Sequence, residues 1–217
     1  IRPARLVTQM LDAGQTERQA LRTMEQEFFV APERAALCLD TARASRAASA
    51  ALAPEDISLY VGIPFCPTRC AYCSFVSASV EKTFSMMDPY LDALAREIAL
   101  MGASVKRLGL RIKSVYLGGG TPTTLSAAQL AGLLGTLERH FDLSHLAEYT
   151  VEAGRPDTVT AEKLAVLREH GVSRISINPQ TMEDHVLRAI GRRHSEADVY
   201  AAMELAKASG IPHINMD

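Results

Sequence analysis

Ile57-Ser-Leu-Tyr-Val-Gly-Ile63 alternates apolar and polar or small residues, and Pro64-Phe-Cys66-Pro-Thr-Arg-Cys70-Ala-Tyr-Cys73 follows it directly. This period of two predicts a strand over residues 57–63, because successive side chains of a strand point to opposite faces of a sheet. In parallel α/β folds, functional loops follow the carboxyl ends of the strands. The cysteine segment is therefore expected at the functional edge of a sheet.

The same alternation recurs along the rest of the chain. It predicts further strands at 114–118, 148–152, 174–178 and 213–217, with amphipathic helices at 89–101, 126–141, 160–170, 183–190 and 196–209. Strands that alternate with helices indicate repeated βα units and a parallel sheet. We expect an α/β fold, a partial (β/α) TIM-like barrel that is truncated after about five strands.

The two faces of the predicted sheet differ in polarity. One face is apolar in every strand and is expected to meet the helices. A parallel sheet covered on both faces is apolar almost throughout, and polar groups are costly to bury without partners. We therefore expect the second face to line a ligand-sized cavity, the alternative being a face exposed to solvent. Its side chains are Ser58, Tyr60, Gly62, Tyr116, Gly118, Thr150, Glu152, Ser176, Asn178, Asn215 and Asp217.

Residues 1–53 carry helical spacing only, as in Leu6/Met10 and Leu21/Met24. This pattern predicts a small N-terminal helical appendage, and the barrel core is expected over 54–217. The stretch 43–53 is rich in Ala, Ser and Arg and is followed by Pro54, which favours a linker.

Composition excludes several classes of protein. With 23 basic and 25 acidic residues among 217, the net charge is −2, which provides no overall field for nucleic acid or an anionic membrane. No apolar run approaches the roughly 20 residues that span a bilayer. Three of the four cysteines fall within one short segment rather than in a disulfide framework, so we expect a reducing, cytoplasmic compartment.

The cysteine spacing points to a metal cofactor. A closed zinc site takes four ligands, and the only other thiol, Cys38, falls on the apolar face of a predicted helix. Three thiolates suit a [4Fe–4S] cluster in which one iron lacks a protein ligand and is open to a small molecule. This is the cofactor arrangement of S-adenosylmethionine (SAM) radical chemistry, and a structural zinc protein is the alternative.

Seven stretches in order carry a resemblance to a known family. The chain resembles radical SAM proteins, specifically the oxygen-independent coproporphyrinogen III dehydrogenase (oxidase) family and its HemZ-type branch. The likeness is close over 56–217 and loose over 1–52. The stretches are Tyr60-Val-Gly-Ile-Pro-Phe-Cys66, Cys70-Ala-Tyr-Cys73-Ser-Phe75, Gly118-Gly-Gly-Thr-Pro122, Glu152, Ile177-Asn-Pro-Gln180, Gly191-Arg-Arg-His194 and Ile214-Asn-Met-Asp217.

The resemblance implies a set of cofactor-binding residues. Cys66, Cys70 and Cys73 would hold the cluster, and one or two SAM molecules would contact Tyr60, Tyr72, Gly119, Gly120, Thr121, Glu152, Gln180, Arg192 and Asp217. Glycine without a Cβ lets backbone approach a ligand closely, and a guanidinium can bind both oxygens of a carboxylate. The alternatives are plain packing for the two tyrosines, an anion cradle or tight turn for the glycines, and an internal ion pair for Glu152.

The family's activity is oxidative decarboxylation of the propionates of coproporphyrinogen III to vinyl groups. The implied partners are coproporphyrinogen III or a related porphyrin and an external electron donor. The best-characterised dehydrogenases carry a fourth cysteine two residues after the last ligand, where this chain has Phe75. That form is shared with a sister branch that resembles haem chaperones, so a haem-binding protein without dehydrogenase activity is the alternative.

Overall fold

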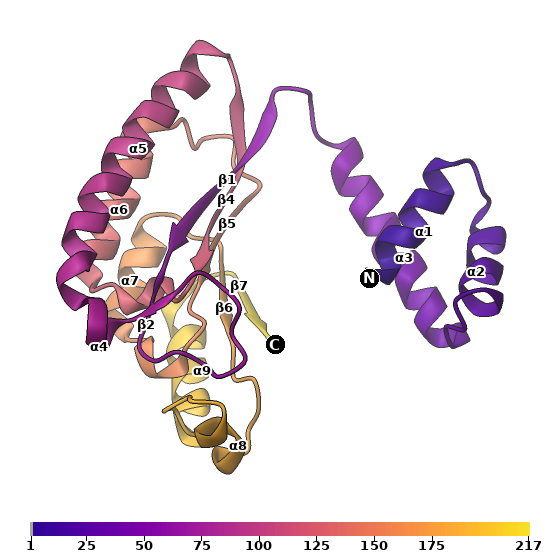
Figure 1. The fold of residues 1–217 in the computed structure, drawn as a ribbon. Helices are drawn as coiled ribbons and strands as arrows, with labels where there is room; N and C mark the ends of the chain where they lie inside the picture. Colours follow the sequence, from indigo (N-terminus) through magenta and orange to yellow (C-terminus); the bar gives the residue numbers. More distant parts are fainter. Residues whose placement is uncertain (1) are drawn as a thin grey trace. The chain divides into compact units, whose positions relative to one another are not determined.

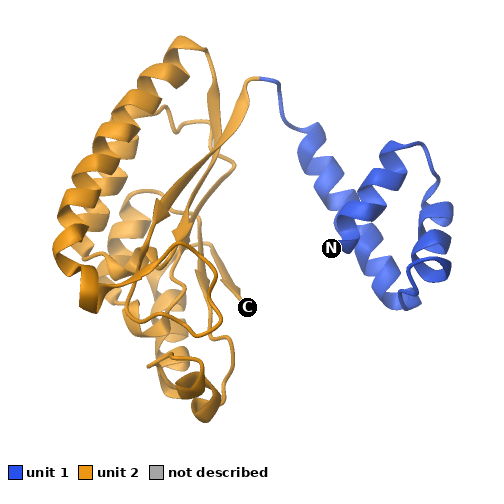
Figure 2. Cartoon of the chain, viewed as in Figure 1, with its two compact units in different colours: residues 1–54 blue, residues 55–217 orange. Residues whose placement is uncertain are grey.

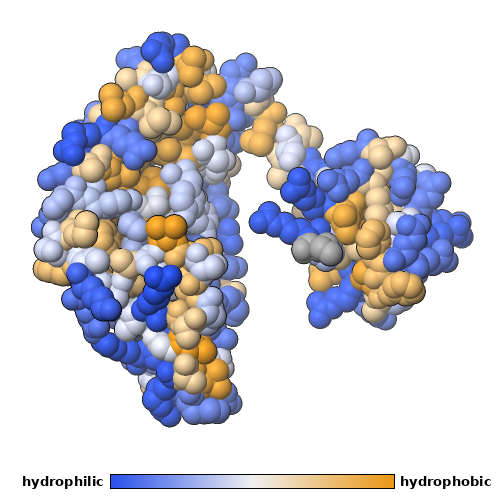
Figure 3. Space-filling view, viewed as in Figure 1, coloured by the Kyte–Doolittle hydropathy of each residue, from blue (hydrophilic) through white to orange (hydrophobic). Residues whose placement is uncertain are grey.

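The computed structural model describes residues 2–217, and the chain divides into two compact units. Unit 1 comprises residues 1–54 and unit 2 residues 55–217 (Figure 2). Among the described residues, no helix is both long and apolar enough to cross a bilayer. Hydrophilic and apolar residues are mixed over the face of unit 2 that Figure 3 shows.

Unit 1 is built from helices α1 (Pro3–Asp12), α2 (Glu17–Gln26) and α3 (Pro32–Ala50). Val7, Met24 and Leu39, one from each helix, are buried in a core of their own. The prediction of a linker over 43–53 is wrong for most of its length, because α3 continues to Ala50. Alanine and arginine are strong helix formers, and this outweighs the low-complexity appearance of the stretch.

Unit 2 contains a sheet of five parallel strands in the order β1-β4-β5-β6-β7 (Figure 1). This confirms the predicted α/β fold, and each predicted strand is present within a few residues. The strands are β1 (Asp56–Ile63), β4 (Arg111–Gly119), β5 (Glu148–Glu152), β6 (Arg174–Ile177) and β7 (His213–Met216). A short parallel pair, β2 (Phe65–Cys66) with β3 (Ala78–Ser79), was not predicted.

Helices of unit 2 cover one face of the sheet (Figure 1). Sheet residues such as Leu117, Val151 and Ile175 pack there with Leu134 and Leu164 in one apolar core. Met216 of the same predicted face is exposed, because β7 forms an edge of the sheet. The helices are α4 (Val80–Thr83), α5 (Met87–Arg107), α6 (Ala127–His140), α7 (Ala161–Glu169), α8 (Asp184–Ala189) and α9 (Glu196–Ser209), with 3₁₀ turns at Phe84–Met86, Pro122–Thr124 and Pro156–Thr158.

Helix α5 departs most from the sequence prediction. It begins at Met87 rather than at residue 89, and the Asp88 carboxylate in its first turn accepts a hydrogen bond from Gln129 Nε2 at 2.8 Å. The helix also continues through Gly102 to Arg107. A Cβ at Gly102 would lie 2.5 Å from the carbonyl oxygen of His140, so glycine allows α5 to pack against the end of α6.

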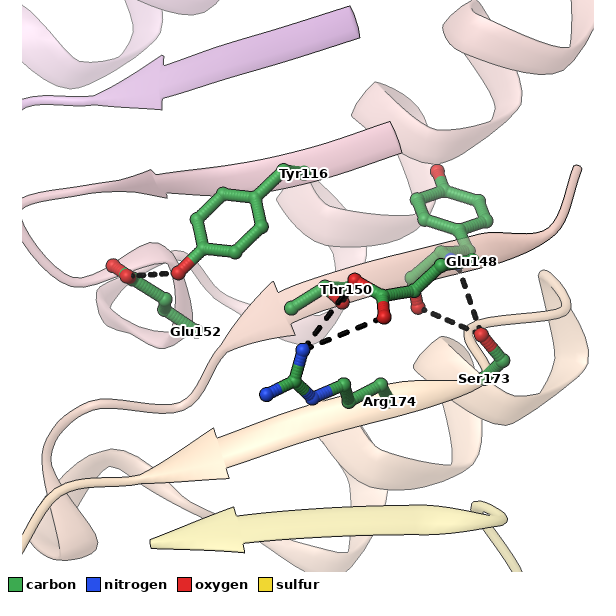
Figure 4. A network of polar contacts seen from close by, with 7 residues as sticks. Tyr116, Glu148, Thr150, Glu152, Ser173 and Arg174 are labelled. Carbon is green, nitrogen blue, oxygen red and sulfur yellow. Dashed lines mark hydrogen bonds and ion pairs between the residues drawn. The ribbon is translucent and has the colours of Figure 1, made fainter. Parts of the chain in front are cut away.

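Polar side chains of the opposite face bond to one another (Figure 4). Arg174 pairs with Glu148 at 3.4 Å, and Thr150 donates to the same carboxylate at 2.8 Å. Ser114 donates to Ser58 across β4 and β1, also at 2.8 Å. These bonds pair several of the polar groups on this face, whereas the helix-covered face forms the apolar core.

Leu134→Ala is expected to lower the free energy of unfolding by about 3 kcal/mol, because this fully buried α6 side chain would leave a cavity. Urea unfolding followed by circular dichroism measures the change. Leu100→Ala is the matched control, since that α5 side chain is 72% exposed and its loss should change stability by less than about 0.5 kcal/mol. Equal effects of the two substitutions would contradict the described core.

Candidate functional site

A cavity of about 300 Å³ lies at the carboxyl ends of the strands. The predicted site residues line it, except Tyr60 and Asp217, and Phe75, Gly154, Arg155 and Asn178 complete its wall. The structure thus brings together segments that are far apart in the sequence. Parallel strands place their following loops at one edge of the sheet, and this explains the convergence.

The cysteine segment enters the cavity from the end of β1. Cys66 ends β2, and Cys70 and Cys73 follow in a turn in which the Cys73 amide donates to the Cys70 carbonyl at 3.2 Å. All three thiols are partly exposed and unbridged. Within residues 2–217, no three potential ligands lie close enough to hold a single metal ion. An iron–sulfur cube binds each cysteine through a different iron, so a wider spacing of the sulfurs fits that cofactor.

The glycine-rich turn after β4 packs against the cysteine segment. The Gly120 amide donates to the Ile63 carbonyl at 2.7 Å, and the Thr121 amide donates to the Phe65 carbonyl at 2.8 Å. A Cβ at Gly120 would lie 2.7 Å from the Phe65 oxygen and 3.0 Å from Cys66 Sγ. The sequence predicts that glycine lets the backbone of this turn approach a ligand. In the structure, the missing Cβ of Gly120 lets the turn pack against the cysteine segment.

Threonine 121 extends the contact between the two segments. Its hydroxyl lies 3.4 Å from Cys66 Sγ and is oriented to donate to it. A hydrogen bond to a thiolate stabilises its negative charge, which is a further property expected of a cluster ligand.

Glu152 belongs to a cluster of aromatic and acidic groups on the polar face (Figure 4). Tyr116 donates its hydroxyl proton to Glu152 at 2.5 Å, so the carboxylate has a hydrogen-bond partner rather than an internal ion pair. Burial, and secondly this bond, raise the pKa of Tyr116 and keep it a neutral donor. Tyr60 is 62% exposed and stacks on Tyr116 with ring centroids 5.9 Å apart. Burial raises the pKa of Tyr60, and the Glu152 charge adds to this.

Tyr72, Gln180 and Asp217 form a hydrogen-bonded chain. The Tyr72 hydroxyl donates to Gln180 Oε1 at 2.6 Å, and Asp217 accepts from both the backbone amide and the side-chain amide of Gln180. The backbone of Gln180 has a φ of 70°, which a non-glycine residue adopts at a cost. The bonds to Asp217 hold this conformation and aim the side chain at Tyr72.

Arg192 is 7% exposed and donates to backbone carbonyls of Asn178 and Gly154. Its Nε is buried without a hydrogen-bond partner in the described part of the chain. A buried, incompletely satisfied guanidinium fits a site for an anionic ligand group. The neighbouring His194 is buried, which lowers its pKa and keeps it neutral, and its Nε2 donates to the Pro179 carbonyl at 3.2 Å.

Sequence reasoning did not single out Arg155, and it placed Asn178 and Tyr116 on the polar face without naming them as cofactor-binding residues. Arg155 lies three residues after the predicted strand 148–152 and Asn178 ends the predicted strand 174–178, and these positions at the carboxyl ends could have identified both. Tyr116 was placed on the polar face, but its bond to Glu152 depends on the pairing of β4 with β5.

Residues 60–217 match the family model described as the radical SAM superfamily. The oxygen-independent coproporphyrinogen-III oxidase-like protein HemZ of Bacillus subtilis (strain 168) is 37% identical over 220 residues, covering 100% of this chain and 44% of that protein. Heme chaperone HemW of the same organism is 40% identical over 161 residues, covering 74% of this chain and 41% of the relative.

Among solved structures, coproporphyrinogen III oxidase (HemN) from Escherichia coli, titled a radical SAM enzyme, matches with a TM-score of 0.67. It is 30% identical, and the match covers 80% of this chain and 39% of that one. This chain therefore spans less than half the length of each of these three proteins.

Gly120→Ala is expected to push the cysteine segment away from the glycine-rich turn, and so to lower the iron and sulfide bound after anaerobic reconstitution about tenfold. Colorimetric iron and sulfide analysis measures the loss. Gly132→Ala is the matched control, because a Cβ there meets no atom within 4 Å. Full iron content in the Gly120 variant would show that the close approach is not needed.

Proposed function

This chain belongs to the radical SAM superfamily, which implies a [4Fe–4S] cluster and SAM, and we propose that it acts as an oxygen-independent coproporphyrinogen III dehydrogenase. The observation that carries this proposal is the extent of the likeness to the HemZ protein, which covers all of this chain, unit 1 included. The likeness to the haem chaperone covers 74% of it. A shared helical unit favours the oxidase-like branch.

Cys66, Cys70 and Cys73 are the proposed ligands of the cluster, with the remaining iron open to SAM. Together the cluster and SAM supply a 5′-deoxyadenosyl radical, which can take a hydrogen atom from an unactivated carbon. The cavity wall beside Cys66 is backbone from the glycine-rich turn, and the Thr121 hydroxyl faces the Cys66 sulfur. These groups leave one side of the cysteine segment accessible to a small molecule.

Charged groups across the cavity match those of an amino acid. Glu152 would accept hydrogen bonds from the amino group or ribose hydroxyls of SAM, since Tyr116 occupies only one of its oxygens. Arg192 would bind a SAM carboxylate, because its buried Nε has no protein partner in the described residues. Tyr72 and Gln180 extend this wall, and Asp217 holds Gln180 in place; these are the groups that a second SAM molecule would contact.

The proposed reaction converts a propionate to a vinyl group. Removal of one hydrogen atom from the propionate carbon next to the pyrrole leaves a carbon radical. Loss of CO₂ from the carboxylate then forms the carbon–carbon double bond and releases one electron to an acceptor. An external donor supplies the electron that reduces the cluster. The protein's part is to position the propionate beside the cavity and to exclude water from the radical.

A haem-binding function is the second candidate, and Phe75 favours it. This side chain occupies the position of a fourth cysteine in the dehydrogenases, and it is 66% exposed while lining the cavity. The 40% identity to heme chaperone HemW over 161 residues also favours this second candidate. An exposed aromatic ring at this edge offers a face on which a planar porphyrin can stack.

Cys70→Ala is expected to abolish the broad visible absorption of the iron–sulfur cluster, because a cube with two protein ligands is released. Cys38→Ala is the matched control, since Cys38 lies in unit 1 and should leave iron content unchanged. Metal analysis accompanies the spectra. Stoichiometric zinc in place of iron, or a full cluster in the Cys70 variant, would contradict the ligand assignment.

Anaerobic reconstitution, reduction with dithionite and chromatography test the reaction. The protein is expected to release 5′-deoxyadenosine with SAM, and to convert coproporphyrinogen III to the divinyl product with loss of CO₂. Glu152→Gln should lower the rate at least tenfold, because the charge that faces the SAM amino group is lost. A cluster that never yields the nucleoside, together with stable haem binding, would favour the second candidate instead.

A further inference from the structure

Arg155 is a buried charge in the wall of the cavity that no step of the proposed reaction uses. It lies three residues after the end of β5, is 3% exposed, and lines the same cavity as the three cysteines of the proposed cluster. A buried arginine is rare unless its charge and its donors are matched by other groups. Its contacts therefore indicate what it does there.

Both described hydrogen bonds of the Arg155 side chain reach the middle of the cysteine segment. Its Nη2 donates to the carbonyl oxygen of Thr68 at 2.6 Å and to the Thr68 hydroxyl at 2.5 Å. Thr68 lies midway between Cys66 and Cys70, and its own hydroxyl donates to the Gly191 carbonyl at 2.7 Å. Arg155 thus ties the segment between two proposed ligands to the end of β5.

No described acidic side chain forms an ion pair with Arg155. Its Nη1 is buried without a hydrogen-bond partner among residues 2–217. None of the ion pairs that these residues form includes it. An unpaired buried charge is costly, so an anionic group is expected beside it. A [4Fe–4S]²⁺ core held by three thiolates carries a net negative charge, and reduction makes that charge larger.

We propose that Arg155 is a positioning residue of the cluster site, which holds the Cys66–Cys70 segment through Thr68 and raises the reduction potential of the cluster by its charge. The inference rests on the proposed function in one respect, the assignment of the three cysteines as ligands. It does not depend on the substrate. A positive charge stabilises the reduced, more negative cluster over the oxidised one, which gives the direction of the effect.

The test uses the full chain, reconstituted anaerobically and titrated with redox dyes under electron paramagnetic resonance, without SAM or porphyrin. Arg155→Met removes the charge and the donors at similar length, and Arg155→Lys keeps the charge. Thr68→Val keeps the charge and the backbone acceptor but loses the hydroxyl. Arg193→Met is the matched control, because Arg193 is exposed and pairs with Glu81 at the surface.

Arg155→Met is expected to shift the midpoint potential of the cluster to more negative values. The midpoint potentials of Arg155→Lys and Arg193→Met should stay near that of the parent protein. Both Arg155→Met and Thr68→Val should lose iron to EDTA about tenfold faster, since the cysteine segment is less firmly held. Thr68→Val should not shift the potential. Should Arg155→Met fail to fold by circular dichroism, Arg155→Gln replaces it, because its side chain is polar and uncharged.

An unchanged potential in the uncharged variant would overturn the inference while leaving the proposed function intact. A shift of the midpoint potential in Arg193→Met as large as that in Arg155→Met would likewise overturn the inference and leave the proposed function intact. A parent protein that forms no cluster would instead overturn the ligand assignment on which the proposed function depends. A parent cluster that is tuned by Arg155 but supports no porphyrinogen oxidation would remove only the substrate proposal.

Discussion

Two backbone hydrogen bonds, from Gly120 to Ile63 and from Thr121 to Phe65, hold the site together. They continue the pairing of β1 with β4 beyond the last residues of the two strands, where a side chain at position 120 would separate them. Because this approach is close, the glycine-rich turn and the first cysteine share one edge of the sheet. The side of the cavity formed by the cysteine segment and the glycine-rich turn depends on that contact.

Electrostatics gives the cavity its second constraint. Arg155 and Arg192 are both buried in its wall, and each keeps a nitrogen without a partner in the described residues. Glu152 contributes a negative charge to the same wall, and its carboxylate accepts a hydrogen bond from Tyr116. A site that presents two buried cations and one anion is suited to a ligand set with the reverse charges, namely a thiolate-bound cluster and an amino acid zwitterion.

Much of the fold could be predicted because hydrophobic periodicity is local information. The five parallel strands and the helices α6 to α9 follow it to within a few residues. Prediction failed where a tertiary contact decides the outcome, as at Gly102, whose packing on His140 lets α5 continue. The residues predicted from motif spacing line one cavity, except Tyr60 and Asp217, which contact Tyr116 and Gln180 instead. Arg155 was missed because its partner, Thr68, is 87 residues away in the chain.

The anchors of the cysteine segment lie far downstream of it. Thr68 bonds to Gly191, 123 residues later, and the Ala71 amide bonds to the Ile190 carbonyl. During synthesis, therefore, the three cysteines leave the ribosome well before Ile190 and Gly191, whose carbonyls bind the cysteine segment. A domain that folds as a unit cannot present a finished metal-binding loop at that stage. On the proposed ligand assignment, the seat of the cluster is therefore complete only after the α8–α9 connection has emerged.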